Sequence, residues 1–381
     1  MSLLEHIPGI AALGYIVPFL AVLTVVVFFH ELGHFLVARW NGVKVDSFSI
    51  GFGPELLGFN DARGTRWRLS AIPLGGYVKF HGDSDVASMP DFESAGAMSD
   101  SEKSVSFMYK PVSQRAAIVA AGPIANFLLA IVIFSITFMT LGRPLTDPLV
   151  SKVQADSAAQ EAGFEPGDVV VSVDGARIRS FTEIPPLVAP NPGRTMRFVI
   201  NRDGRDIDLE VTPRLTMRTD RFGNRQEIGV IGLENDSKQA NFRIERLGPV
   251  EAVGAAASET WFIVTRTLGY LGDVVTGFRS ADQLGGPIRI AKISGDVATL
   301  GIGALINLAA ILSVSIGLLN LFPIPMLDGG HLVFYAFEAL RGRPLSDGAQ
   351  EVGFRIGLAI VLMLMVFATW NDVTQLVFNA G

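Results

Sequence analysis

The stretch that decides the fold is His30-Glu31-Leu32-Gly33-His34, which follows a run without charged residues from Ile7 to Phe29. The next charged residue after Glu31 is Arg39. Side chains at positions i and i+4 share one face of a helix, so His30 and His34 can direct both imidazoles at one metal ion. This is the zinc-hydrolase pattern, in which two imidazoles hold the ion and the glutamate takes a proton from water. Ionisable residues in a membrane segment are costly, which favours a functional role for this motif.

The composition indicates a polytopic membrane protein. Of 381 residues, 49% are hydrophobic and 18% are charged, and the mean hydropathy is +0.39, which is too apolar for an ordinary soluble protein. The net charge of −6 and the lack of a recognisable nucleic-acid-binding motif argue against a nucleic-acid partner. Because the chain has no cysteine, His, Asp and Glu remain as ligands for a metal. The N-terminal apolar run lacks a basic start and exceeds signal length, so we expect a retained span.

Four apolar segments approach the ~20 residues that a membrane helix needs. They are about Ile10–Val37, Ala116–Leu141, a charge-free stretch within Val297–Leu327, and about Ile356–Trp370. Lys and Arg accumulate in cytoplasmic loops, and residues 1–38 and 356–381 contain none. We therefore expect both termini, and the long segment of residues 142–296, to lie outside the cytoplasm.

These patterns predict a polytopic α-helical membrane protein with a cytoplasmic-side membrane-associated β-element and an inserted extracytoplasmic α+β domain. The predicted regions are a first span with the histidine motif at 7–38, a β-region at 43–82, a second span at 116–141, the inserted domain at 145–213, an extension with an amphipathic helix at 214–296, a third span at 297–340 and a fourth at 354–377. Turns at Asp174-Gly175 and Asp203-Gly204 between short strands support the inserted domain. The amphipathic helix, Val250–Phe278, would lie on the outer membrane surface or pack on the bundle.

The β-region carries hairpin signals. Val45–Ile50 alternates in polarity, Gly51-Phe52-Gly53-Pro54 breaks the pattern, and Arg66–Phe80 is strand-like. Beside the active-site span, such a hairpin either dips into the membrane with its backbone groups paired or forms a small cytoplasmic sheet. If it enters the membrane, an unwound substrate could be added as a strand to an edge within Arg66–Ala71.

A third protein ligand is needed for zinc, and Asp328 is the candidate. Pro323 and Pro325 precede it and a diglycine follows it, so the sequence predicts an unwound stretch at membrane depth. Such backbone is tolerated where it lines a cavity. Two alternatives stay open: Asp328 caps the following helix, or His331 supplies the ligand.

The chain resembles the bacterial RseP-type site-2 proteases over nearly its whole length. The resemblance rests on H-E-x-x-H in the first span, N-x-x-P-x-P-x-L-D-G-G from Asn320, a PDZ-like insertion, and the segments Gly122-Pro123-Ile124-Ala125-Asn126-Phe127 and Gly51-Phe52-Gly53. It implies one catalytic Zn²⁺ held by His30, His34 and Asp328, with Glu31 as the catalytic base. It further implies substrate contacts from Asn320, Gly51, Phe52, Gly53, Gly75, Gly76 and Asn126. Many such proteins carry two tandem PDZ domains, whereas this chain has room for one.

The predicted function is zinc-dependent intramembrane endoproteolysis in the bacterial inner membrane. By resemblance, the substrates are single-span membrane proteins of the anti-sigma-factor or remnant-signal-peptide type, and an upstream site-1-type protease cuts them first. The lipid bilayer is the surrounding partner. One rival function is an intramembrane metal-ion transporter, disfavoured because no chain of ligands crosses the membrane. The other is an inactive PDZ scaffold, disfavoured because both metal motifs are intact.

Overall fold

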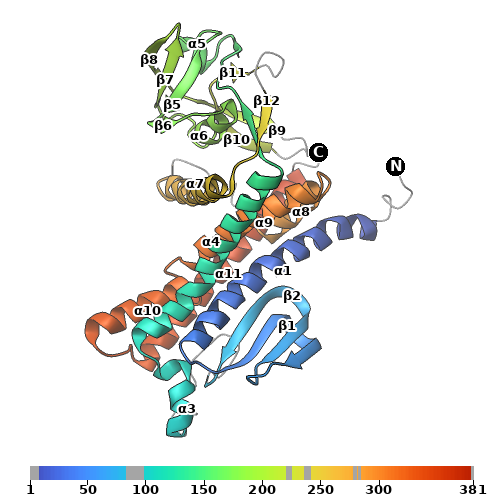
Figure 1. Cartoon of the computed structure of the whole chain (residues 1–381), viewed down its shortest axis with the longest axis vertical. Coiled ribbons are helices and arrows are strands. Elements are labelled where there is room, and N and C mark those ends of the chain that lie inside the picture. The colour runs from blue at the N-terminus through green and yellow to red at the C-terminus, as the bar shows by residue number, and fades with distance from the viewer. Residues whose placement is uncertain are drawn as a thin grey trace. The chain divides into compact units, whose positions relative to one another are not determined.

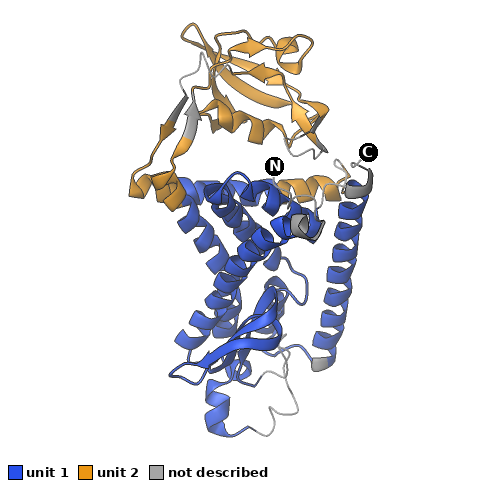
Figure 2. Ribbon diagram, turned by 90° about the vertical axis from the view of Figure 1, so that its right-hand side faces the viewer, with its two compact units in different colours: residues 1–134, 255–267, 284–376 blue, residues 135–254, 268–283, 377–381 orange. Residues whose placement is uncertain are grey.

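A computed structural model describes residues 8–82, 98–219, 225–235, 242–277, 281 and 285–378. The chain divides into two compact units, coloured separately in Figure 2. The first comprises residues 1–134, 255–267 and 284–376, and the second comprises residues 135–254, 268–283 and 377–381. Boundaries between the units fall inside three helices: α4 (Val112–Thr140), α7 (Pro249–Val275) and α11 (Asp347–Phe378).

Long apolar helices dominate the first unit (Figure 1). Its elements are α1 (Pro8–Trp40), β1 (Val45–Asn60), β2 (Arg66–Phe80), α3 (Asp100–Val105), most of α4 (Val112–Thr140), α8 (Pro287–Ala298), α9 (Ile302–Asn320), α10 (Asp328–Arg341) and α11 (Asp347–Phe378). Four described helical segments are long and apolar enough to cross a bilayer: Leu13–Trp40, Val112–Thr140, Ile302–Asn320 and Gly348–Gln375. The prediction of a polytopic helical membrane protein is confirmed in this form.

The predicted third span at 297–340 is not one helix, which corrects the sequence-based boundary. Helix α8 ends within it, α9 follows, and residues 321–327 are non-helical before α10 begins at Asp328. Pro323 and Pro325 lack the backbone N–H groups that would continue α9, and Met326 adopts a φ of +87°. Asp328 is therefore placed by a bent loop and not by a straight membrane helix.

The loop before α10 is tightly packed. A Cβ atom added to Gly329 would lie 2.2 Å from the Leu321 carbonyl oxygen, and one added to Gly330 would lie 2.3 Å from that of Ile324. On α11, a Cβ added to Gly357 would lie 1.9 Å from the Pro325 carbonyl oxygen. Backbones approach each other this closely only where side chains are missing, so these glycines fix the course of the loop.

Strands β1 and β2 fold back on themselves and form more than a simple hairpin. Ser47–Ile50 pairs with Gly76–Lys79 and also with Arg66–Leu69. The distal half of β1, Glu55–Asn60, covers the other side of the Arg66 segment. The prediction of a free strand edge within Arg66–Ala71 is wrong for Arg66–Leu69, because both sides of that segment are paired. Among the residues that the structure describes, Glu55–Asn60 and Gly76–Phe80 are each paired on one side only and form the two edges of the sheet.

An aromatic core fixes this β-element beside α1 (Figure 1). Phe48 is fully buried, with its ring centroid 5.8 Å from that of Phe28, 5.5 Å from Phe35 and 4.4 Å from Trp67. Fully burying a side chain of this size contributes about 1.5–3 kcal/mol. The sheet is therefore held against the helix that carries the histidine motif.

A polar contact ties the far turn of the β-element to the end of α1. Arg39 pairs with Asp61 and donates a hydrogen bond to Thr65 Oγ1 at 3.0 Å. Burial raises the pKa of Asp61, but hydrogen bonds from Trp67, Thr65, Arg63 and Arg39 outweigh it and hold the pKa at about 2. The carboxylate therefore stays ionised, and the turn stays attached at neutral pH.

The second unit is a small mixed fold around a four-stranded sheet of order β6-β5-β7-β8. Its elements are β3 (Arg143–Thr146), β4 (Lys152–Val153), α5 (Ala158–Glu161), β5 (Val169–Val173), β6 (Ala176–Arg177), α6 (Ile184–Val188), β7 (Met196–Arg202), β8 (Arg205–Val211), β9 (Arg214–Thr219), β10 (Arg225–Val230), β11 (Leu233–Glu234) and β12 (Phe242–Glu245). Ile231 belongs to its buried core and β11 pairs with β4. The compact fold thus extends beyond the predicted boundary at residue 213.

Helix α7 (Pro249–Val275) begins directly after Gly248, with Pro249 in its first turn. Ala252 and Ala256 are fully buried, whereas Val253, Trp261 and Leu268 are exposed. The exposed Val253, Trp261 and Leu268 belong to the apolar spacing noted in the sequence, and the position of this face on the membrane surface stays a prediction.

Candidate metal centre

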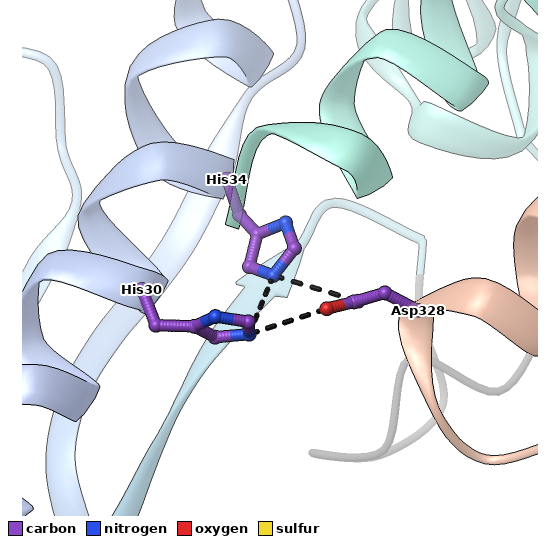
Figure 3. A group of neighbouring side chains, drawn as sticks. All are labelled: His30, His34 and Asp328. Atoms are coloured by element: carbon purple, nitrogen blue, oxygen red, sulfur yellow. Dashed lines mark hydrogen bonds and ion pairs between the residues drawn. The ribbon is translucent and has the colours of Figure 1, made fainter. Parts of the chain in front are cut away.

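His30 and His34 lie one turn apart on α1 and direct their imidazoles to the same point (Figure 3). Their Nε2 atoms are 3.2 Å apart, and both residues are buried. Nδ1 of His34 lies 2.9 Å from the Ile118 carbonyl oxygen of α4. A carbonyl oxygen only accepts, so His34 Nδ1 carries the hydrogen and His34 Nε2 keeps its lone pair.

Asp328, the first residue of α10, completes the group (Figure 3). Its Oδ2 lies 3.2 Å from His30 Nε2, and its Oδ1 lies 3.6 Å from His34 Nε2. One ligand atom from each of the three residues lies within 4.8 Å of the others. Within the described part of the chain, the buried Oδ2 has no hydrogen-bond partner, although it is close to an imidazole nitrogen. Two imidazoles and a carboxylate that faces both of them fit a zinc ion, which takes His and Asp ligands.

Helix α4 forms the wall behind the histidines. A Cβ atom added to Gly122 would lie 2.2 Å from His34 Nε2 and 2.9 Å from His30 Cε1. The Asn126 side-chain amide lies 3.3 Å from His30 Nδ1. In the sequence, the Gly122–Phe127 segment stands out only through a family resemblance. The signal that could have revealed this packing is a Gly-Pro pair in an otherwise regular apolar helix.

A cavity of about 220 Å³ opens at this group. Glu31, Asn320 and His331 line it together with the metal-ligand candidates, and Tyr77 and Val78 contribute from the free edge of β2. The backbone of Gly76 is packed on the catalytic-base candidate, since a Cβ there would lie 3.1 Å from Glu31 Cγ. The cavity thus combines possible metal ligands, a carboxylate and an unpaired strand edge.

The remaining predicted site residues have different locations. His331 lines the cavity but is outside the group of three close ligand atoms. Asn126 is fully buried behind His30 and is not itself among the residues that line the cavity. Gly51, Phe52, Gly53 and Gly75 lie at the bend of the β-element, where the Phe52 ring stacks on Tyr77 with centroids 6.1 Å apart. Their contacts with substrate stay predictions.

The fold and this group of residues define a class: polytopic membrane proteins with a His-His-Asp group and a nearby glutamate, as in metal-dependent hydrolases. Comparison with known proteins narrows the class. The sequence matches the profile of peptidase family M50 over residues 18–364. The chain belongs to peptidase family M50, the site-2 protease family, and is a membrane metalloprotease, so the predicted family is confirmed.

Named relatives cover almost the whole chain. It is 54% identical to "Putative zinc metalloprotease Atu1380" of Agrobacterium fabrum over 96% of this chain and 97% of that protein. It is 53% identical to "Putative zinc metalloprotease R01501" of Rhizobium meliloti over 96% and 98%. It is also 42% identical to Metalloprotease MmpA of Caulobacter vibrioides over 94% and 95%.

Proposed function

We propose that this chain is a zinc-dependent intramembrane endopeptidase in which His30, His34 and Asp328 hold one Zn²⁺ and Glu31 is the general base. The observation that carries the proposal is the convergence of the three ligand atoms within 4.8 Å, from two apolar parts of the chain, beside a cavity that Glu31 also lines. Zinc is the metal in the names of the relatives.

The chemistry requires an activated water and a polarised peptide carbonyl. Zinc held by such ligands is a Lewis acid that activates water and polarises a carbonyl oxygen. Glu31 takes the proton from the attacking water and then delivers it to the leaving nitrogen, so that the C–N bond breaks and an amine leaves. Asn320 at the end of α9 lines the same cavity, where its amide can hydrogen-bond the backbone of the bound peptide.

An unwound substrate needs partners for its backbone in a membrane, because unpaired N–H and C=O groups are costly there. Gly76–Phe80 supplies them by accepting the substrate as an added strand. In the part of the chain that the structure describes, this edge is paired on one side only, and Tyr77, Val78 and Phe80 line the cavity. The close packing of Gly76 on Glu31 favours this edge over the distant Glu55–Asn60 edge. In this arrangement, Gly51–Gly53 and Gly75 shape the sheet that presents the edge.

The proposal extends to setting and substrates. The proposed setting is multi-pass insertion in a bacterial inner membrane. The distribution of Lys and Arg supports an orientation with both termini and the second unit extracytoplasmic. The second unit is proposed as a single PDZ-like domain that selects substrates. Those substrates are single-span membrane proteins, such as anti-sigma factors or remnant signal peptides, already shortened by an upstream site-1-type protease.

The test uses the purified full chain with a single-span model substrate in lipid vesicles. Removal of metal with a chelator should abolish cleavage, and one equivalent of Zn²⁺ per chain should restore it. The same vesicles report on the rival function, because a transporter would move Zn²⁺ into them without substrate. Zinc flux without peptide cleavage would contradict the proposal.

A further inference from the structure

The hydrogen-bond partner of His30 Nδ1 determines how His30 can bind a metal. To bind through Nε2, which faces Asp328 and His34, the ring must carry its hydrogen on Nδ1. Metal-binding histidines normally donate that hydrogen to an acceptor, which fixes the tautomer and the ring orientation. His34 has such an acceptor in the Ile118 carbonyl oxygen. For His30, the corresponding neighbour is the Asn126 side chain.

The Asn126 amide can take two orientations, and only one of them fits a metal-binding His30. With its nitrogen toward His30 Nδ1 at 3.3 Å, Oδ1 is buried and lacks a hydrogen-bond partner within the described residues. That orientation donates to Nδ1 and thus requires the hydrogen on Nε2, where a metal must bind. Amide oxygen and nitrogen have nearly the same shape, so their assignment follows from the network. A half-turn of the amide directs Oδ1 to Nδ1 as an acceptor.

Asn126 is also held rigidly in place. Its side chain is fully buried, and its backbone carbonyl accepts a hydrogen bond from Ser313 Oγ of α9 at 2.8 Å. A Cβ added to Gly317 of α9 would lie 3.1 Å from Asn126 Cβ, so the two helices are in close contact here. The amide therefore has little room to move except by rotation about its own axis.

We propose that Asn126 is a positioning residue for the metal centre: its Oδ1 accepts the hydrogen of His30 Nδ1 and so presents Nε2 to zinc. This inference rests on the proposed zinc site and adds α4 to it as the supporting layer for both histidines. It replaces the substrate contact expected for Asn126, which is buried behind the ligand.

The test measures zinc affinity by competition with a chelator, together with the visible spectrum of the Co²⁺-substituted protein. Asn126→Leu removes the acceptor and should weaken zinc binding by the ~10- to 100-fold typical of lost supporting partners. Asn126→Asp keeps an acceptor oxygen and should retain the affinity, with Co²⁺ bands shifted because an anionic acceptor makes His30 a stronger donor. Ser315→Ala is the matched control, because Ser315 Oγ donates to the Ile311 carbonyl within α9 at 3.0 Å and not to Asn126, and it should leave affinity and spectrum unchanged.

The variants separate positioning from packing. A purely structural role predicts that a buried aspartate is at least as harmful as leucine, so equal losses in both variants would overturn the proposal. Unchanged affinity in Asn126→Leu would also overturn it. If Asn126→Leu does not fold, the Co²⁺ spectrum of Asn126→Asp decides, and unshifted bands count against the proposal. Failure of the wild-type chain to bind zinc would instead contradict the metal centre itself.

Discussion

Gly122 of α4 faces His34 of α1 so closely that a Cβ atom at position 122 would lie 2.2 Å from His34 Nε2. That nitrogen is the one directed at Asp328. A side chain at position 122 would thus clash with His34, whose Nε2 is a candidate ligand atom. Helix α4 therefore packs directly against the candidate metal ligands, although it contributes no side chain to the group of His30, His34 and Asp328.

Gly122→Ala should weaken zinc binding by at least ~10-fold, the scale of disturbed supporting contacts, because the added methyl displaces His34. Gly14→Ala in α1 is the matched control, since a Cβ there meets no atom within 4 Å. Zinc titration of the purified variants distinguishes them. Equal zinc affinity in Gly122→Ala and the wild type would show that α4 can move aside for the added methyl group without displacing His34.

Asp328→Asn should weaken both zinc binding and cleavage, because a neutral amide is a poorer ligand than a carboxylate. His331→Asn should leave zinc affinity near the wild-type value, since His331 lies outside the group of close ligand atoms. Metal content after dialysis against a weak chelator measures both variants. Loss of zinc in His331→Asn, with zinc retained in Asp328→Asn, would make His331 the third ligand and leave Asp328 as a helix cap.

Single prolines across Gly76–Lys79 should reduce cleavage wherever the removed N–H faces away from Ser47–Ile50, while zinc content stays normal. Alanine at Tyr77, Val78 and Lys79 is the control, because it changes the side chain but keeps the N–H group. Gly76 has no alanine control, since a Cβ there would lie 3.1 Å from Glu31 Cγ. Proline at Leu57, on the opposite edge, should leave turnover unchanged. Full turnover in all four zinc-loaded proline variants would exclude strand addition at this edge.

Replacing residues 147–241 by a two-residue Asn-Gly turn should leave zinc bound and change which substrates are cut. Thr146 and Phe242 are paired across β3 and β12, so their ends are close enough for a hairpin turn. All three candidate ligands belong to the first unit. Zinc loss in the folded variant would give the removed segment a structural role instead of a selective one.

Much of the architecture was predictable because its signals are local. A long charge-free run predicts a span, and H-E-x-x-H predicts two imidazoles on one helical face, as His30 and His34 show. The prolines near Asp328 likewise predict a break in the helix, which the structure has between α9 and α10.

The parts that sequence analysis missed depend on contacts between distant residues. Alternation within Arg66–Phe80 predicts a strand, but not that Ser47–Ile50 pairs on both sides and leaves Gly76–Phe80 as the free edge. The helix pattern of α4 likewise does not reveal that Gly122 and Asn126 contact the histidines. Local periodicity specifies which face of an element is buried, but not its neighbour.

The most direct test of the central claim compares the wild-type chain with Glu31→Gln in zinc content and in cleavage of a single-span substrate in vesicles. Glu31 is assigned to proton transfer and not to metal binding, so the variant should hold one zinc per chain. Its cleavage rate should fall at least ~100-fold, the scale of general-base catalysis. A zinc-loaded Glu31→Gln variant that cleaves at the wild-type rate would contradict the proposed mechanism.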